Sequence, residues 1–292
     1  MMPLQYHQIP FHCPQKVAKA LDNFLNETEA ISVTLMDAED APIYEPGLEE
    51  TPLWPKVKLL ALFSTDAALQ TTLTLLKKFL DPFPPYEIDL IEERDWITEI
   101  QNQFQPLCFG NKLWVYPEWQ SIPSEHQPAL KLSPGLAFGT GSHPTTQLCL
   151  EALTQGVRPG MTVIDYGCGS GILGIAALTL GASQTYFVDI DPQALAATQR
   201  NAAANGFKKL WIDQPENLPP LQADLIVTNI LAKPLMELRQ VFEQLLKPQG
   251  KMILSGILAS QAEMLIHHYA PWKALTTFRQ QEEWVCLVNF FS

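Results

Sequence analysis

Three glycines and one aspartate in the middle of the chain have the types and spacing of a nucleoside-binding site. Gly167, Gly169 and Gly171 form a G-x-G-x-G turn, and Asp189 lies 22 residues after Gly167. Glycine lacks a Cβ, so such a turn can adopt positive φ and let a ligand approach the backbone closely. The Asp189 carboxylate can accept hydrogen bonds from ribose hydroxyls. These four residues therefore predict a site for a nucleoside.

The residues around the turn predict the strand, helix and strand that would position it. An apolar run at 162–164 ends at Asp165, a helical pattern covers 172–180, and a second apolar run at 186–188 ends at Asp189. This order describes one βαβ unit of a parallel sheet, with the helix N-terminus offering unpaired N–H groups to a ligand. A tight turn beside a charged strand end, without any ligand, is the alternative interpretation.

The glycine turn and four further segments resemble the ribosomal protein L11 methyltransferase family, whose members are class I S-adenosylmethionine-dependent enzymes. The segments are LSPGLAFGTGSHPTT (132–146), VDIDPQAL (188–195), NAAANG (201–206) and TNILAKPL (228–235). The similarity covers nearly the whole chain. It implies a Rossmann-like α/β catalytic domain, S-adenosylmethionine as cofactor, and methylation of lysine side chains of a ribosomal protein. The N-terminal amine stays open as a further target.

The predicted site combines positions read from the pattern with positions carried over by the resemblance. Asn229 follows the fourth predicted strand, so its amide oxygen can accept hydrogen bonds from an amine and orient the lone pair for methyl transfer. On position alone a polar turn residue is the favoured interpretation of Asn229, but N-I-L-A at 229–232 resembles the family motif. That resemblance implies that Asn229 serves catalysis, and no residue is assigned as a general base. The expected cofactor-binding residues are Thr146, Gly167, Gly169, Gly171, Asp189 and Asn229.

The segment before the first catalytic helix predicts local structure as well as ligand contact. Glycines at 135, 139 and 141 indicate a backbone that folds over a ligand. Ser142 is expected to cap the helix, with Pro144 in its first turn. His143 is expected to form structural hydrogen bonds rather than act as a base. In the glycine turn, Cys168 is expected to be a small packed residue rather than a reactive thiol.

The remaining hydrophobic patterns predict two domains. Residues 1–91 follow the order βαββαβ of a ferredoxin-like α+β domain, proposed to recognise the substrate. Residues 92–130 are expected to form a linker that begins with a helix over 92–104, and 131–292 the catalytic domain. Beyond the central unit, the expected helices are 192–205, 231–246 and 260–268, and the expected strands are 210–212, 224–227, 251–254, 272–278 and 284–291.

The charge distribution bears on the partner. The net charge is −12, and residues 1–100 carry 17 acidic and 7 basic side chains. An acidic surface of this kind can attract a basic ribosomal protein, although composition alone slightly favours a solvated acidic face that only aids solubility. A nucleic-acid partner would favour the opposite sign. We therefore expect no direct nucleic-acid contact.

Several classes of protein are disfavoured by composition. No apolar run reaches the length of a membrane span, and the N-terminus lacks the pattern of a signal peptide. The 5 cysteines are scattered without a C-x-x-C motif, which favours reduced thiols in the cytoplasm and no metal site.

Three alternative functions remain at this stage. A nucleic-acid N-methyltransferase would also use an asparagine at the fourth strand end, although N-I-L-A stands here in place of N-P-P-Y. A nicotinamide oxidoreductase and a binding module with a vestigial nucleoside site are the other two.

Overall fold

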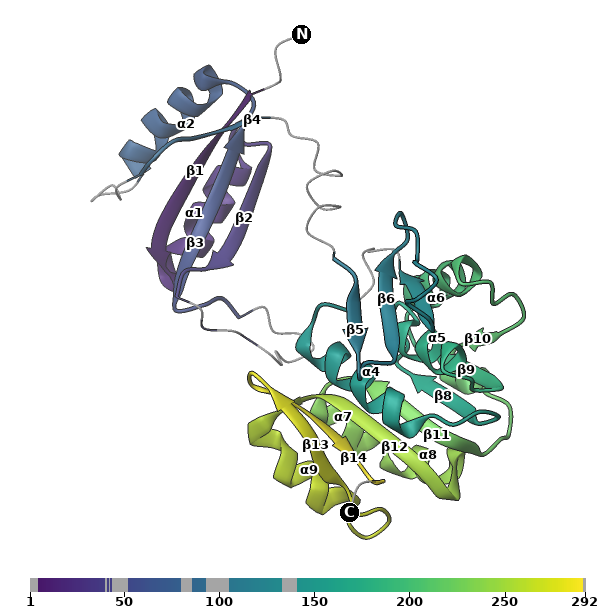
Figure 1. Cartoon of the computed structure of the whole chain (residues 1–292). Helices are drawn as coiled ribbons and strands as arrows, with labels where there is room; N and C mark the ends of the chain where they lie inside the picture. Colours follow the sequence, from purple (N-terminus) through teal and green to yellow (C-terminus); the bar gives the residue numbers. More distant parts are fainter. Residues whose placement is uncertain are drawn as a thin grey trace. The chain divides into compact units, whose positions relative to one another are not determined.

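The chain divides into two compact units, residues 1–99 and residues 100–292 (Figure 1). The computed structural model describes residues 5–39, 41, 43, 52–79, 86–92, 105–132 and 141–290. Among these residues, no helix combines the length and the apolarity that a membrane crossing requires.

The first unit has the predicted ferredoxin-like arrangement. Its four-stranded sheet has the order β2-β3-β1-β4, and every pair of neighbours is antiparallel. The predicted order βαββαβ is therefore confirmed. The elements are β1 (Gln5–Pro14), α1 (Gln15–Asn26), β2 (Ser32–Asp37), β3 (Lys56–Phe63), α2 (Asp66–Phe79) and β4 (Asp89–Glu92).

Buried and more exposed side chains alternate along β3, which shows how the sheet packs against its two helices. Val57, Leu59, Ala61 and Phe63 are fully buried, while the residues between them are exposed or half-buried. A period of two places all four side chains on one face of the strand. They belong to one core with buried leucines from α1 and α2: Leu21, Leu25, Leu69, Leu73 and Leu76.

The second unit contains a seven-stranded sheet with the order β10-β9-β8-β11-β12-β14-β13. The first five strands in this order are parallel to one another, and β14 pairs antiparallel with both β12 and β13. This is the α/β architecture predicted for the catalytic domain. The strands are β8 (Thr162–Tyr166), β9 (Gln184–Val188), β10 (Trp211–Asp213), β11 (Ala223–Asn229), β12 (Leu246–Leu258), β13 (Thr276–Gln281) and β14 (Trp284–Val288).

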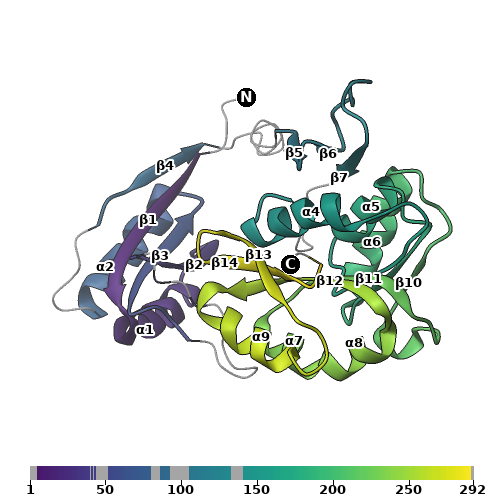
Figure 2. The ribbon, with the colours of Figure 1, turned by 60° about the horizontal axis from the view of Figure 1, so that its bottom comes forward.

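Helices cover both faces of this sheet, as the apolar runs of its central strands require. Figure 2 shows α4, α5 and α6 on one face and α7, α8 and α9 on the other. The helices are α4 (Pro144–Gly156), α5 (Ile172–Thr179), α6 (Pro192–Ala204), α7 (Ala232–Glu237), α8 (Arg239–Leu245) and α9 (Ala262–Tyr269). Two short 3-10 turns, η1 (Pro215–Asn217) and η2 (Ala259–Gln261), complete the unit.

A third sheet lies in the segment expected to be a linker. Its strands are β5 (Leu107–Phe109), β6 (Leu113–Pro117) and β7 (Ala129–Leu132), in that order. The side chain of Asn205, at the end of α6, accepts from Lys131 N at 2.7 Å and donates to Lys131 O at 2.7 Å. These bonds attach the small sheet to the end of α6 within the second unit. Of the helix expected over 92–104, Glu92 is the last residue of β4, and residues 93–104 lie outside the described residues.

The helix predicted over 231–246 is two helices, because the chain turns at Leu238 between α7 and α8. The helical segment ends at Leu245, within one residue of the predicted end, but the strand predicted over 251–254 begins earlier, at Leu246. Leu246 pairs with Ala223 and Lys251 pairs with Leu225, so residues 247–250 interrupt the ladder. Proline is tolerated at such an irregularity because it removes no ladder hydrogen bond there.

Candidate active site

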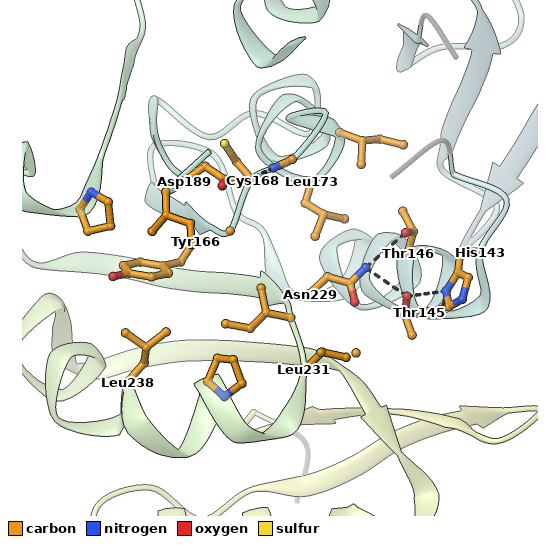
Figure 3. A pocket seen from close by; sticks show the side chains of 18 of the residues that line it. His143, Thr145, Thr146, Tyr166, Cys168, Leu173, Asp189, Asn229, Leu231 and Leu238 are labelled. Carbon is orange, nitrogen blue, oxygen red and sulfur yellow. Dashed lines mark hydrogen bonds between the residues drawn. The ribbon is translucent and has the colours of Figure 1, made fainter. Parts of the chain in front are cut away.

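A cavity of about 550 Å³ opens at the carboxyl ends of β8, β9 and β11 (Figure 3). In open α/β sheets this edge is where ligands bind, and the volume suits a nucleoside-sized molecule. Five of the predicted residues line the cavity: Thr146, Gly167, Gly169, Asp189 and Asn229. The sixth, Gly171, stands behind the turn as the N-cap of α5.

The glycine turn has the backbone conformation that its sequence predicts. The φ angles of Gly167, Gly169 and Gly171 are 74°, 55° and 79°. Side chains from α6 hold the turn, since Thr198 Oγ1 donates to Gly169 O at 3.0 Å. A Cβ on Gly171 would lie 2.8 Å from Thr198 Cγ2, so both φ and packing require glycine there.

The NAAANG segment has a structural role on the far side of this turn. Asn201 Nδ2 donates to Ser170 O at 2.8 Å, inside the protein. Asn201 therefore fixes the turn, while Asn205 holds β7 as described above. The NAAANG segment therefore supports the glycine turn and does not line the cavity.

Asp189 directly follows β9 and has its carboxylate on the cavity wall. Its Oδ2 accepts from Gly169 N at 2.9 Å and its Oδ1 accepts from Asp191 N at 3.0 Å. Each carboxylate oxygen can accept more than one hydrogen bond, so both can still receive ribose hydroxyls. The backbone donors fix the orientation of the carboxylate before any ligand arrives.

Asp165 is a fully buried carboxyl beneath the glycine turn. Its Oδ2 accepts from Gly174 N at 2.8 Å, which joins β8 to the first turn of α5. Its Oδ1 has no partner among the described residues. Burial raises the pKa of Asp165 to about 8, with Asp189 adding to the increase and the Gly174 N–H opposing it. The group is therefore mostly protonated at neutral pH.

Cys168 packs inside the turn, as predicted. It is 4% exposed, and its thiol lies 3.3 Å from Thr198 Oγ1. Burial raises the pKa of the thiol well above its usual range, so the reactive thiolate is suppressed. The expectation of an unreactive packed residue is confirmed.

Asn229 ends β11 and presents a polarised amide to the cavity. Its Nδ2 donates to Thr145 Oγ1 at 3.1 Å and to Thr146 Oγ1 at 3.3 Å. Its Oδ1 is buried and has no hydrogen-bond partner among the described residues. Figure 3 shows the nitrogen directed at the two threonines and the oxygen turned away from them. A buried acceptor left unpaired in this way is a place for a ligand donor.

The two threonines belong to the first turn of α4, whose cap differs from the prediction. His143, not Ser142, is the N-cap, and its Nδ1 accepts from Thr145 N at 3.3 Å. Pro144 occupies the first helical position, as expected. His143 has the structural hydrogen-bonding role predicted for it. Within the loop predicted to fold over a ligand, residues 133–140 lie outside the described residues.

The sequence model for ribosomal protein L11 methyltransferase (PrmA) matches residues 5–290 of the chain. The chain belongs to this family. Ribosomal protein L11 methyltransferase of Actinobacillus succinogenes is 46% identical over 281 residues, covering 95% of this chain and 96% of that protein. The protein of the same name from Histophilus somni (strain 129Pt) is 45% identical over 281 residues, covering 95% of each chain.

A solved structure extends the family comparison to the fold. Ribosomal protein L11 methylase from Lactobacillus delbrueckii subsp. bulgaricus is 32% identical, with a TM-score of 0.57. The match covers 63% of this chain and 97% of that one, so the solved chain is about as long as the second unit alone. The family resemblance and the class I methyltransferase fold are thereby confirmed.

Several wall residues of this ribosomal protein L11 methyltransferase family member were not predicted from the sequence. Ile190 is 78% exposed beside Asp189, and Leu231 is 39% exposed beyond Asn229. An apolar residue one or two positions after a polar strand end is the sequence signal that could have found both. Trp284 and Gly256 also line the cavity, but they come from β14 and β12 and have no local signal.

We expect Asp189→Ala to weaken binding of S-adenosylmethionine by about 10-fold to 100-fold, because a charge-assisted hydrogen bond contributes about 1.5–3 kcal/mol. Calorimetry on the folded variant measures the affinity. Asp191→Asn is the matched control, because it keeps an acceptor for Gln193 N at the cap of α6. Unchanged affinity in Asp189→Ala would remove the ribose assignment.

The turn after Asn229 depends on close backbone contact with β12. Ile230 N donates to Ser255 O at 3.1 Å. Gly256, the residue after Ser255, has a φ of 83°. A Cβ on Gly256 would lie 2.4 Å from Ile230 O. The position of Asn229 is therefore set partly by a glycine 27 residues further along the chain.

Gly256→Ala should destabilise the protein by about 1–3 kcal/mol more than Gly160→Ala, because the added methyl overpacks a backbone contact. Gly160 is the matched control, since its φ is 86° and a Cβ there would meet no described atom within 4 Å. Denaturant unfolding of both variants measures the difference. Equal losses would show that only the strained φ matters at Gly256.

Proposed function

We propose that this protein transfers methyl groups from S-adenosylmethionine to amino groups of ribosomal protein L11, with lysine side chains as the main acceptors. One observation carries the proposal. A single cavity contains a glycine turn with an acidic strand end at one side and the unpaired amide oxygen of Asn229 at the other. The first part suits a nucleoside cofactor and the second suits an N–H donor.

The wall residues fit S-adenosylmethionine in chemical type. Gly167 and Gly169 allow close approach of the cofactor to the backbone, and Asp189 accepts from its ribose. Ile190 offers an exposed apolar side chain to a flat base. When bound, the cofactor supplies a methyl group activated by a sulfonium centre.

The acceptor amine must be neutral before it can attack. A free lysine has a pKa of about 10.4, and transfer into a poorly hydrated cavity lowers it. The lysine gives its proton to solvent as it enters. Asn229 Oδ1 then accepts one remaining N–H, which directs the lone pair toward the methyl group. With the cofactor held by the glycine turn and Asp189, attack of this lone pair would break the bond between the methyl carbon and sulfur, and the methylated amine would carry the positive charge.

Apolar side chains on the β11 side of the cavity suit the stem of a lysine. Leu231, Pro234 and Leu238 line this part, together with Trp284, which is 8% exposed. Such a wall excludes water from the reacting nitrogen and contacts the four methylene groups of the acceptor.

We also propose that the acidic first unit docks the substrate. Its excess of carboxylates complements a basic ribosomal protein, and the same charge disfavours direct binding of nucleic acid. A substrate of this kind places the reaction in the cytoplasm, where ribosomal proteins are made.

Mass spectrometry tests the proposal directly. Purified protein, S-adenosylmethionine and L11 should give L11 species heavier by one or more methyl groups, and peptide mapping should place them on lysines. Ribosomal RNA offered as the alternative acceptor should stay unmodified. Methyl transfer to RNA without transfer to L11 would overturn the proposal.

A further inference from the structure

A chain of hydrogen bonds runs from the helix cap to the proposed catalytic amide. His143 Nδ1 lies 2.7 Å from Thr145 Oγ1, and Thr145 Oγ1 accepts from Asn229 Nδ2 at 3.1 Å. Figure 3 shows the three side chains in line along one wall of the cavity. The chain connects the start of α4 to the end of β11, 84 residues further along the sequence.

The backbone N–H of Thr145 sets the direction of the hydrogen bonds in this chain. Thr145 N–H points at His143 Nδ1, so this nitrogen acts as an acceptor and the ring proton resides on Nε2. The Thr145 hydroxyl then donates to Nδ1. Its oxygen is left with lone pairs only, which favour the NH2 group of Asn229 over the carbonyl oxygen as their partner. The amide therefore keeps Oδ1 directed away from the threonines.

The opposite arrangement shows why the state of the histidine matters. A proton on Nδ1 would face the Thr145 N–H, and the Thr145 hydroxyl would turn its hydrogen toward Asn229. That hydrogen would favour the flipped amide, which places NH2 where an amine substrate needs an acceptor. Burial of His143 lowers its pKa and outweighs the opposing effect of Glu282 and Glu283, which favours the neutral ring.

We propose that His143 and Thr145 are positioning residues, which hold the Asn229 amide with its oxygen toward the acceptor amine. His143 touches neither cofactor nor amine in this scheme and acts through Thr145. The inference rests on the proposed function, because only an N–H substrate requires an acceptor at Asn229 Oδ1. Thr146 Oγ1, 3.3 Å from Asn229 Nδ2, is a second contact that limits the effect of losing Thr145.

Two pairs of variants of the full-length protein test the chain. Thr145→Val removes the hydroxyl and keeps the branched shape, whereas Thr145→Ser keeps the hydroxyl. His143→Leu removes the acceptor, whereas His143→Asn keeps an acceptor oxygen at the position of Nδ1 and remains a good N-cap. Thr145→Val and His143→Leu should each lower kcat for L11 methylation roughly tenfold, the loss expected for one orienting hydrogen bond.

The conservative variants and the cofactor affinity separate positioning from a purely structural role. Thr145→Ser and His143→Asn should retain kcat within about threefold of the original protein, and all four variants should bind S-adenosylmethionine within about threefold of its affinity. If His143→Leu does not fold, the Thr145 pair decides. Equal kcat for Thr145→Val and Thr145→Ser, or a loss of affinity equal to the loss of kcat, overturns the proposal.

The tautomer of His143 gives a readout that does not depend on activity. Nitrogen NMR of the protein labelled at histidine should show His143 neutral, with an unprotonated Nδ1 and a protonated Nε2. A proton on Nδ1 at neutral pH would overturn the proposed direction of the chain. If the original protein methylates no lysine of L11, the proposed function fails, while the tautomer still decides the hydrogen-bond chain.

Discussion

Asn229→Ala should lower kcat for L11 methylation by about 100-fold, because misplacement of the attacking group by about 1 Å can cost that much. Affinity for S-adenosylmethionine should fall by less than about threefold, since Asp189 and the glycine turn are unchanged. The physical reason is the unpaired Oδ1, which is buried and has no partner among the described residues. Removing it deletes the proposed acceptor for the amine without touching the ribose site.

Single-turnover kinetics and calorimetry measure the two effects separately. Asn229→Ala also leaves Thr145 and Thr146 without a donor, so the fold of α4 is checked by circular dichroism. Asp189→Ala is the matched comparison, because it should reduce cofactor affinity more than turnover. Equal losses of affinity and turnover in Asn229→Ala would move this residue from the amine to the cofactor.

Removal of the first unit should have the other large effect. A chain that starts at residue 105 should fold and bind S-adenosylmethionine within about threefold of the full-length affinity, because every residue lining the cavity lies beyond that point. It should lose L11 methylation by about 100-fold or more, because the tethered docking surface that concentrates the substrate is gone. The solved relative of similar length supports independent folding of the second unit.

The salt dependence of L11 methylation tests whether the negative charge of the first unit attracts the substrate. Apparent KM for L11 should rise with salt in the full-length protein, because exposed charges are screened over about 8–10 Å near physiological ionic strength. A full-length variant with Glu27→Gln, Glu29→Gln and Asp66→Asn should show a weaker dependence, since these exposed carboxylates lie in the turn after α1 and at the start of α2. The shortened chain could instead methylate L11 as well as the full-length protein does at every salt concentration. That result would mean that the acidic face only aids solubility.

The local features of the site were predictable from the order of residues. The glycine turn, the strand before it and the acidic strand end at Asp189 follow one another within a single βαβ unit. Positive φ at the glycines and an apolar period are properties of short segments, so they can be recognised without knowing the fold. The ferredoxin-like order of the first unit was predictable for the same reason, because each element has its own hydrophobic pattern.

The site beyond this unit depends on contacts between distant segments. The family resemblance selected Thr146, whereas the structure also directs Asn229 to Thr145 and makes His143 the cap. Which of these neighbouring side chains faces Asn229 depends on how α4 packs against β11. Gly256 and Trp284 enter the cavity because β12 and β14 lie in the same sheet as β11.

Sequence alone therefore determined the family, the α+β and α/β order of the elements and the proposed cofactor side of the cavity, whose residues lie close together in the chain. Tertiary structure decided the acceptor side, where Asn229, Thr145 and Gly256 come from three separate elements. Hydrogen-bond direction and close backbone packing set that geometry, and both depend on distances across the fold rather than on spacing along the chain.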